Sequence, residues 1–272
     1  MKKQRDIIGV LLNLFFVLVA IFILAPIIVV IVNSFNGVAY SVFPLQGVSL
    51  RWYEKLTTES GFISGALKSI QVSSWAVIIA MVVGVPAAYA LSRFNFPFKN
   101  MIYSFLVLPL AVPKIVMGLA LFVLFVKVKI YGTLFGLAIA HSFLVLPFVI
   151  VMVSAAVKGI PRAQEEAAMD LGARPLKTFF QVIIPQIMVA MILSASLGFV
   201  FSFDQVEASI FLVRSGNYTL PLEMMVYMEK YQDPTIAALS TVMIMCVLIL
   251  AFIVYLSVRK KEMNIVGKTP LN

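Results

Sequence analysis

The stretch GIPRAQEEAAMDLGARPLKTFFQVIIP, residues 159–185, is a long polar interruption between two strongly apolar parts of the chain. Pro161 suits the first turn of a helix, where the N–H that proline lacks would have no partner. Gly172 then predicts the end of this helix, and Pro175 predicts the start of a second short one. We call this stretch the elbow and predict a helix–turn–helix.

The first helix of the elbow divides into two faces at 100° per residue. The charged face consists of Arg162, Glu165, Glu166 and Asp170. The face of small or apolar residues consists of Ala163, Ala167, Ala168 and Leu171. Such a small, smooth face buries little area by itself, so we expect it to fit a groove on another molecule.

The composition indicates an integral membrane protein. The 272 residues are 62% hydrophobic and 12% charged, whereas soluble domains carry about 25% charged residues. The single cysteine, Cys246, excludes a disulfide framework and a cysteine metal site. The single histidine, His141, excludes most histidine-based chemistry, and we expect it to form an interhelical hydrogen bond, with a proton relay as the alternative.

Six apolar runs are long enough to cross a bilayer, which takes about 20 residues each. These predicted spans are about 9–33, 66–91, 101–126, 133–157, 186–206 and 236–258. The fold class is therefore all-α integral membrane, with the elbow between the fourth and fifth spans. We find neither a repeat nor a linker and predict one domain, 1–272, whose first span is not cleaved.

Lys and Arg gather at the ends of the spans, so the formal charge of +9 indicates membrane topology and not a nucleic-acid partner. Thirteen of these residues fall on one side, seven fall on the other, and Lys114 lies within a span. The positive-inside rule then places both termini and the elbow in the cytoplasm. Two loops, 34–65 and the acidic 207–235, are expected outside, the first with an interfacial helix over residues 49–56.

The elbow resembles the signature of importer-type ABC transporter permeases: Glu-Ala-Ala, three residues, Gly, nine residues, Ile, one residue, Leu-Pro. Here the signature reads Glu166-Ala167-Ala168, Gly172, Val182 and Ile184-Pro185, with every spacing kept and two conservative departures. The resemblance implies a type I ABC importer transmembrane domain whose elbow docks on a cytoplasmic ATPase. The alternative is an ordinary amphipathic surface helix.

A wider resemblance, to the second permease of spermidine/putrescine-type importers (the PotC branch of the polyamine/opine group), covers nearly the whole chain. Besides the elbow, it is carried by residues 26–36, 49–56, 140–151, 201–212 and 218–228. It implies a bacterial inner-membrane subunit with a second permease as a heterodimer, an ATPase dimer and an extracytoplasmic substrate-binding protein. The chain lacks G-x-x-x-x-G-K-[ST], so we expect ATP and Mg on the ATPase, no cofactor on this chain and no enzymatic activity.

Four residues are candidates for the substrate pathway. Asp204 ends the fifth span, where a charge near hydrocarbon is expensive, and the resemblance links the matching acid to polyamine passage. Glu207 is one turn further on and would support it. Trp52 matches a family tryptophan whose ring face would attract an ammonium. The alternatives are pairing of Asp204 with Arg214 or backbone capping, and an interfacial anchor for Trp52.

Lys114 is the residue least like its relatives, which usually carry an acid after this proline. It would repel a polycation unless it is paired, for instance with Asp204, and it would suit an opine, amino acid or aminophosphonate. Alternatively it snorkels or faces a partner subunit. An ion-gradient-driven secondary transporter is the rival from another class, but it would be expected to show paired intramembrane acids or inverted repeats.

Overall fold

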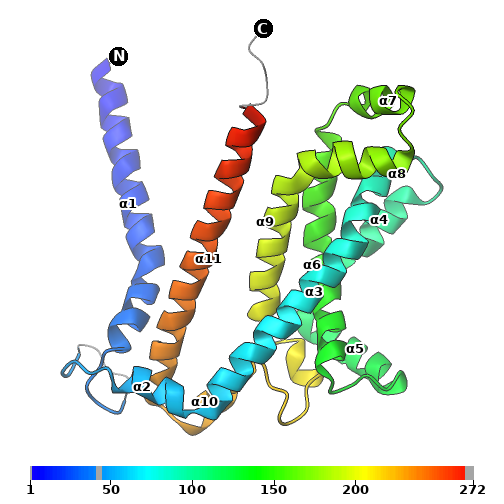
Figure 1. The fold of residues 1–272 in the computed structure, drawn as a ribbon. Coiled ribbons are helices and arrows are strands. Elements are labelled where there is room, and N and C mark those ends of the chain that lie inside the picture. Colours follow the sequence, from blue (N-terminus) through cyan, green and yellow to red (C-terminus); the bar gives the residue numbers. More distant parts are fainter. Residues whose placement is uncertain (1, 41–44, 267–272) are drawn as a thin grey trace. The chain divides into compact units, whose positions relative to one another are not determined.

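The computed structural model describes residues 2–40 and 45–266, and the described part is helical (Figure 1). Its only β-type pairing is an isolated bridge between Asn36 and Val48. The chain forms two compact units. The first comprises Met1–Ile63 and Met224–Leu248, and the second comprises Ser64–Glu223 and Ile249–Asn272.

The described helices occur in the following order along the chain. They are α1 (Lys2–Asn33), α2 (Arg51–Thr58), α3 (Ser60–Arg93), α4 (Lys99–Val107), the 3₁₀ turn η1 (Leu108–Leu110), α5 (Lys114–Lys127), α6 (Leu134–Lys158), α7 (Arg162–Asp170), α8 (Pro175–Thr178), the π-helical turn η2 (Phe179–Ile183), α9 (Ile184–Phe203), the 3₁₀ turn η3 (Ser209–Phe211), α10 (Leu220–Lys230) and α11 (Thr235–Val266).

Five of the six predicted spans are helices long and apolar enough to cross a membrane. The predicted third span, 101–126, is broken instead of continuous: Lys99–Leu110 and Lys114–Lys127 meet at 105°. Pro109 and Pro113 flank the break, and a proline both lacks the N–H that would continue a helix and disfavours helical geometry in the residue before it. The pair is therefore either a bent span or a re-entrant loop.

Two further boundaries differ from the prediction. The second helix of the elbow is not separate, because Pro175–Phe203 forms one run of 29 residues that continues through the π-helical turn into the fifth span. The stretch 207–235, predicted as a loop, contains the helix α10. The predicted interfacial helix is present as α2.

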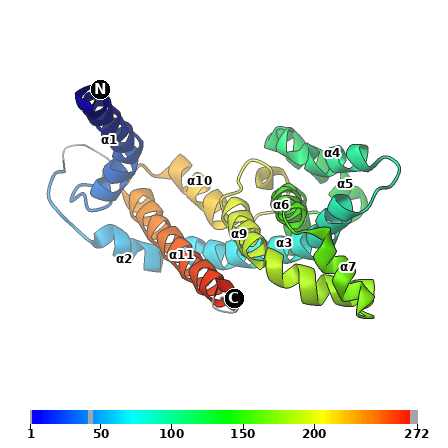
Figure 2. The same ribbon diagram turned by 90° about the horizontal axis from the view of Figure 1, so that it is seen from above.

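The second unit is built around α6, which packs against α3 and α9 (Figures 1 and 2). One stripe of α6 repeats every four residues, as one face of a helix does, and consists of Val145, Val149, Val153 and Val157, all fully buried. Glycines allow the close approach: a Cβ on Gly84 of α3 or Gly198 of α9 would lie 2.8 Å or 2.5 Å from a valine of this stripe. Small residues at helix contacts are typical of membrane bundles.

The ends of this bundle carry different elements. The elbow lies where α6 ends and α9 begins, and α5 lies near the other end (Figure 1). A second apolar cluster joins α5 to the start of α6, with Leu121, Phe125 and Leu137 among its buried members. A helix of 20 residues such as α9 is about 30 Å long, so the two ends are about the thickness of a bilayer's hydrocarbon core apart.

Candidate functional site

The first helix of the elbow, α7, turns its apolar face outward and one charged residue inward. Glu165 is its only buried residue. Ala163 and Ala167 are exposed, and Leu171, directly after the helix, is 90% exposed. Most of the alanine-lined face is therefore exposed, whereas the charged face is not entirely solvated.

The residues of the elbow signature fall in two groups. Glu166, Ala167 and Gly172 are exposed and Ala168 is half-buried. Gly172 has φ +87° with open space around the position of a Cβ, which confirms its role as a left-handed helix stop. Pro185 lies apart from them, exposed in the first turn of α9.

An ion pair that the sequence did not predict holds α7 to the end of α3. Arg93 Nε lies 2.5 Å from Glu165 Oε1, and both side chains are 8% exposed. The Tyr89 hydroxyl donates to Glu165 Oε2 at 2.8 Å, and Arg93 Nη2 donates to the carbonyl of Ile160 at 2.8 Å. The sequence offered two signals for this ion pair: a basic residue at the end of one span and a glutamate directly before the elbow signature.

At the other end of α9 a second ion pair lies open. Lys114, the first residue of α5, places Nζ 3.2 Å from Glu207 Oε2 and 4.6 Å from the centre of the Phe201 ring. Both charged side chains are exposed, by 39% and 53%. The ammonium of Lys114 is thus held by a carboxylate and an aromatic face together, the two groups that bind alkylammonium ions.

Asp204 lies directly after α9, exposed and without an ion pair among the described residues. The alternative partner, Arg214, instead lies 4.8 Å from the centre of the Tyr131 ring. Lys114 pairs with Glu207, not with Asp204. The next side chain, Gln205, is 2% exposed, yet neither end of its amide has a hydrogen-bond partner in the described part of the chain.

His141 fixes the segment that carries these acids. Its ring, 1% exposed, lies between two hydroxyls: Nδ1 is 2.8 Å from Ser202 Oγ and Nε2 is 2.8 Å from Ser209 Oγ. The two serines flank the turn that contains Asp204 and Glu207, so α6 holds that turn at both sides. The predicted interhelical hydrogen bond of the histidine is confirmed.

Comparison with known proteins decides the family. The family model described as "Binding-protein-dependent transport system inner membrane component" matches residues 80–262. The chain belongs to this family. As a permease of that family, it is a transport subunit and not an enzyme, as predicted.

Curated relatives of the permease extend over most of its length. The spermidine/putrescine transport system permease protein PotC of Haemophilus influenzae is 32% identical over 92% of this chain and 97% of its own. The putrescine transport system permease protein PotI of Escherichia coli is 32% identical over 90% and 89%. The sulfate transport system permease protein CysT of Salmonella typhimurium is 28% identical over 78% and 82%.

Solved structures agree on the fold. A chain of a bacterial ABC transporter that imports the acidic polysaccharide alginate matches with a TM-score of 0.72 at 20% identity, over 94% of this chain and 97% of that one. A chain of the methionine ABC transporter MetNI in an inward-facing conformation matches with a TM-score of 0.61 at 18% identity, over 74% and 95%. The permease therefore has the predicted all-helical fold of a type I ABC transporter membrane domain.

In the first unit of the permease, Trp52 is buried and already occupied. It is 5% exposed, and its Nε1 donates to the carbonyl of Asn36 at 2.7 Å. The guanidinium of Arg51 lies 4.2 Å from the centre of the ring. A substrate ammonium would have to displace Arg51 to reach that face, so this structure favours a packing role for Trp52.

A third ion pair also lies in the first unit. Lys55 Nζ is 2.7 Å from Asp233 Oδ2, and the Tyr227 hydroxyl donates to the same carboxylate. Desolvation opposes the charged form of Lys55, but Asp233 and Tyr227 outweigh it and raise the pKa of Lys55. Desolvation likewise acts to raise the pKa of Asp233, but hydrogen bonds from Lys55 and Thr235 hold that pKa below its ordinary value.

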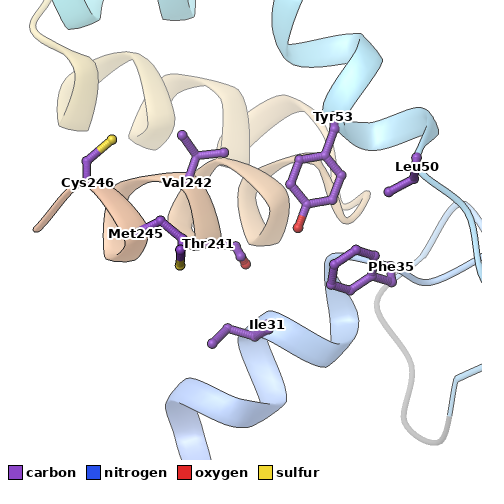
Figure 3. Close-up of a pocket in the computed structure, with 8 residues that line it drawn as sticks. All are labelled: Ile31, Phe35, Leu50, Tyr53, Thr241, Val242, Met245 and Cys246. Carbon is purple, nitrogen blue, oxygen red and sulfur yellow. The ribbon is translucent and has the colours of Figure 1, made fainter. Parts of the chain in front are cut away.

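The first unit also contains an apolar cleft of about 490 Å³ (Figure 3). Its lining comes from α1, α2 and α11 and the turns beside them: Ile31, Phe35, Leu50, Tyr53, Thr241, Val242, Met245 and Cys246. The Tyr53 hydroxyl is already hydrogen-bonded to Ser34 Oγ at 2.6 Å. No charged side chain lines this cleft, so it does not suit a charged, polar solute.

Proposed function

We propose that the permease forms part of the pathway for a polyamine, spermidine or putrescine, in an ATP-driven importer. The relatives named for these solutes cover about nine tenths of the chain. The observation that carries the proposal is the charge balance beside α9. Glu207 neutralises Lys114, so Asp204 remains as an exposed carboxylate that suits an ammonium group.

Around Asp204 the groups that a polyamine needs lie on one short segment. Phe201 offers an aromatic face, Gln205 carries a buried amide without a protein partner, and Glu207 is exposed. A flexible cation that displaced Lys114 from Glu207 and from the Phe201 ring would then be recognised by charge and by ring face.

A second candidate is a solute that bears a carboxylate, phosphonate or similar anion: an opine, an amino acid or an aminophosphonate. Lys114 favours it, because its side chain is 39% exposed and its ammonium would be released if Glu207 moved away. A relative named for sulfate, which is an anion, is also 28% identical to this chain. The two candidates differ in which of the charged residues touches the solute.

The partners follow from the family and from the outward face of the elbow. We infer that a second permease completes a heterodimer and that a cytoplasmic ATPase dimer, carrying ATP and Mg, docks on the elbows. An extracytoplasmic binding protein would deliver the solute. Both termini would lie in the cytoplasm, as the 13-to-7 distribution of basic residues favours.

The substrate is tested by uptake in cells that carry the complete importer. Asp204→Asn keeps the size of the side chain and removes the charge, and it should lower spermidine and putrescine uptake about tenfold or more, the value of a hydrogen bond to a charged group. Glu54→Gln, at an exposed carboxylate of α2, is the matched control. The second candidate would replace the first if Asp204→Asn left polyamine uptake unchanged and if uptake of an anionic amine depended on Lys114.

Docking on the ATPase is tested at Gly172. A β-branched residue at φ +87° is strained, so Gly172→Val should misdirect α7 and abolish both uptake and the stimulation of ATP hydrolysis by loaded binding protein. Gly172→Asn is the matched control, because asparagine tolerates this conformation. If Gly172→Val is inserted and leaves both activities unchanged, the docking proposal is wrong.

A further inference from the structure

The helix α7 has almost no apolar attachment to the rest of the chain. Its one buried side chain is the carboxylate of Glu165, and its apolar side chains are exposed apart from the half-buried Ala168. Most surface helices are held by an apolar stripe that faces the core. What fixes α7 must therefore be largely polar, and polar contacts are directional where apolar ones are not.

These polar contacts all lead to the end of α3. Arg93 contacts α7 through the Glu165 carboxylate 2.5 Å away, and it contacts the chain just before α7 through the carbonyl of Ile160. In return, Arg162 Nη2 donates to the carbonyl of Arg93. The Tyr89 hydroxyl donates to the second carboxylate oxygen of Glu165. The contacts lie on both sides of Pro161, where the chain enters α7, so they fix its direction as well as its position.

The same turn of α3 also contacts the second half of the elbow. The Tyr89 ring lies 4.9 Å from the ring of Phe179, the first residue of the π-helical turn η2. Phe179 is itself buried in the core cluster with α6 residues. Tyr89 therefore touches α7 through its hydroxyl and η2 through its ring.

We propose that Arg93, Glu165 and Tyr89 form a clamp that positions the elbow on α3, so that displacement of α7 moves α3. Displacement of the elbow would then reach the membrane helices through these polar contacts with α3, as well as through the covalent connections of the elbow to α6 and α9. The clamp acts through the elbow, so its role in transport rests on the proposed docking of an ATPase there. Its effect on the direction of α7 does not depend on that docking.

The first arm of the test measures the position of α7 directly. Spin labels at two exposed sites, Asp170→Cys and Asn95→Cys, in a Cys246→Ser background, report the distance between α7 and the end of α3 by pulsed EPR. We expect a narrow distribution in the parent and a clearly broader one in Glu165→Ala. Glu166→Ala, which removes the neighbouring exposed carboxylate, should leave the width unchanged. An unchanged width in Glu165→Ala would overturn the clamp.

The second arm measures solute imported per ATP hydrolysed, in vesicles containing the complete importer and loaded binding protein. Glu165→Ala should keep the ATPase bound and hydrolysis within about twofold of the parent, and should lower the ratio at least fivefold. Glu165→Gln, which retains one acceptor for Tyr89, should fall between them. A broadened distance with an unchanged ratio would leave the clamp without a role in coupling and would overturn the proposal.

The two arms separate the two proposals. If the ATPase fails to bind even to the parent chain, the docking proposal fails, and the EPR arm still decides whether the clamp sets the direction of α7. If the ATPase binds and Gly172→Val uncouples transport while Glu165→Ala does not, docking stands and the clamp is wrong.

Discussion

Two ion pairs lie at opposite ends of α9, and they differ in burial more than in chemistry. Arg93–Glu165, at the elbow, has both side chains 8% exposed, and its two residues form three further hydrogen bonds. Lys114–Glu207, at the other end, is 39% and 53% exposed and shares its ammonium with an aromatic ring. The first pair is enclosed by the protein, and the second is open to exchange with another ion.

Burial changes what an ion pair does for a protein. A buried charge that loses its partner stays desolvated, which is strongly unfavourable, whereas an exposed charge is solvated by water at little cost. The Arg93–Glu165 pair is therefore suited to hold two helices in one arrangement. The Lys114–Glu207 pair is suited to open when a competing charge arrives. The Lys55–Asp233 pair, 31% and 13% exposed, is intermediate.

The largest effect on stability is expected at the buried pair. Arg93→Met leaves Glu165 without its counter-charge and should lower the free energy of unfolding by about 3–5 kcal/mol. This free energy of unfolding is measured by adding a denaturing detergent stepwise to the protein in a mild detergent. The double variant Arg93→Met/Glu165→Leu removes both charges and should recover most of the loss while remaining uncoupled. A loss below about 1 kcal/mol in the single variant would show that the pair is not sealed from water.

An intermediate effect is expected at Lys55–Asp233. Asp233→Asn should cost about 1–2 kcal/mol, the range for a hydrogen bond to a partly solvated charge. Because the pKa of Asp233 is lowered on folding, its contribution is present above the ordinary carboxyl pKa and is lost as the pH falls through the lowered value.

The pKa of Lys55 is raised on folding, so its contribution is present at neutral pH and is lost only as the pH rises through the raised value. Thermal unfolding of the parent should thus lose stability below about pH 4 and at strongly alkaline pH. In Asp233→Asn the acid part of this dependence should shrink. An identical acid limb in the two proteins would contradict the assignment.

The smallest effect on stability is expected at the exposed pair. Lys114→Met should change the free energy of unfolding by less than about 1 kcal/mol. Its effect should appear in selectivity instead, because Asp204 and Glu207 then both face the solute without an opposing charge. Competition between labelled putrescine and an anionic amine should shift severalfold toward putrescine. A large loss of stability, with unchanged selectivity, would assign Lys114–Glu207 a structural role.

The sequence predicted the features that depend on residues close together in the chain. Runs of apolar residues located the membrane helices, and Gly172 located the end of α7, because both signals act within a few residues. Pro109 and Pro113 flank the break in the predicted third span, but the 105° between the two segments depends on how α5 packs against η3 and α6. The helix α10 was missed because acidic residues made that stretch look like a loop.

The site was harder to predict because its contacts join different helices. A helical wheel assigned Glu165 to the charged face of α7, and nothing near it in the sequence shows that Arg93 and Tyr89 lie opposite. Asp204 was one possible partner for Lys114, but α9 ends at Phe203 and the following turn presents Glu207 to the lysine instead. The charges were identified correctly as a group, whereas their pairing required the fold.

The inward glutamate of α7 divides one short helix between two tasks. The exposed residues that would face an ATPase, such as Glu166 and Ala167, are distinct from the inward Glu165 that attaches the helix to its own chain. Substitutions on the outer side would leave the attachment intact, so the recognition of one ATPase or another is free to diverge between related importers. The same separation makes the outer face a practical target for fitting this permease to a foreign ATPase by design.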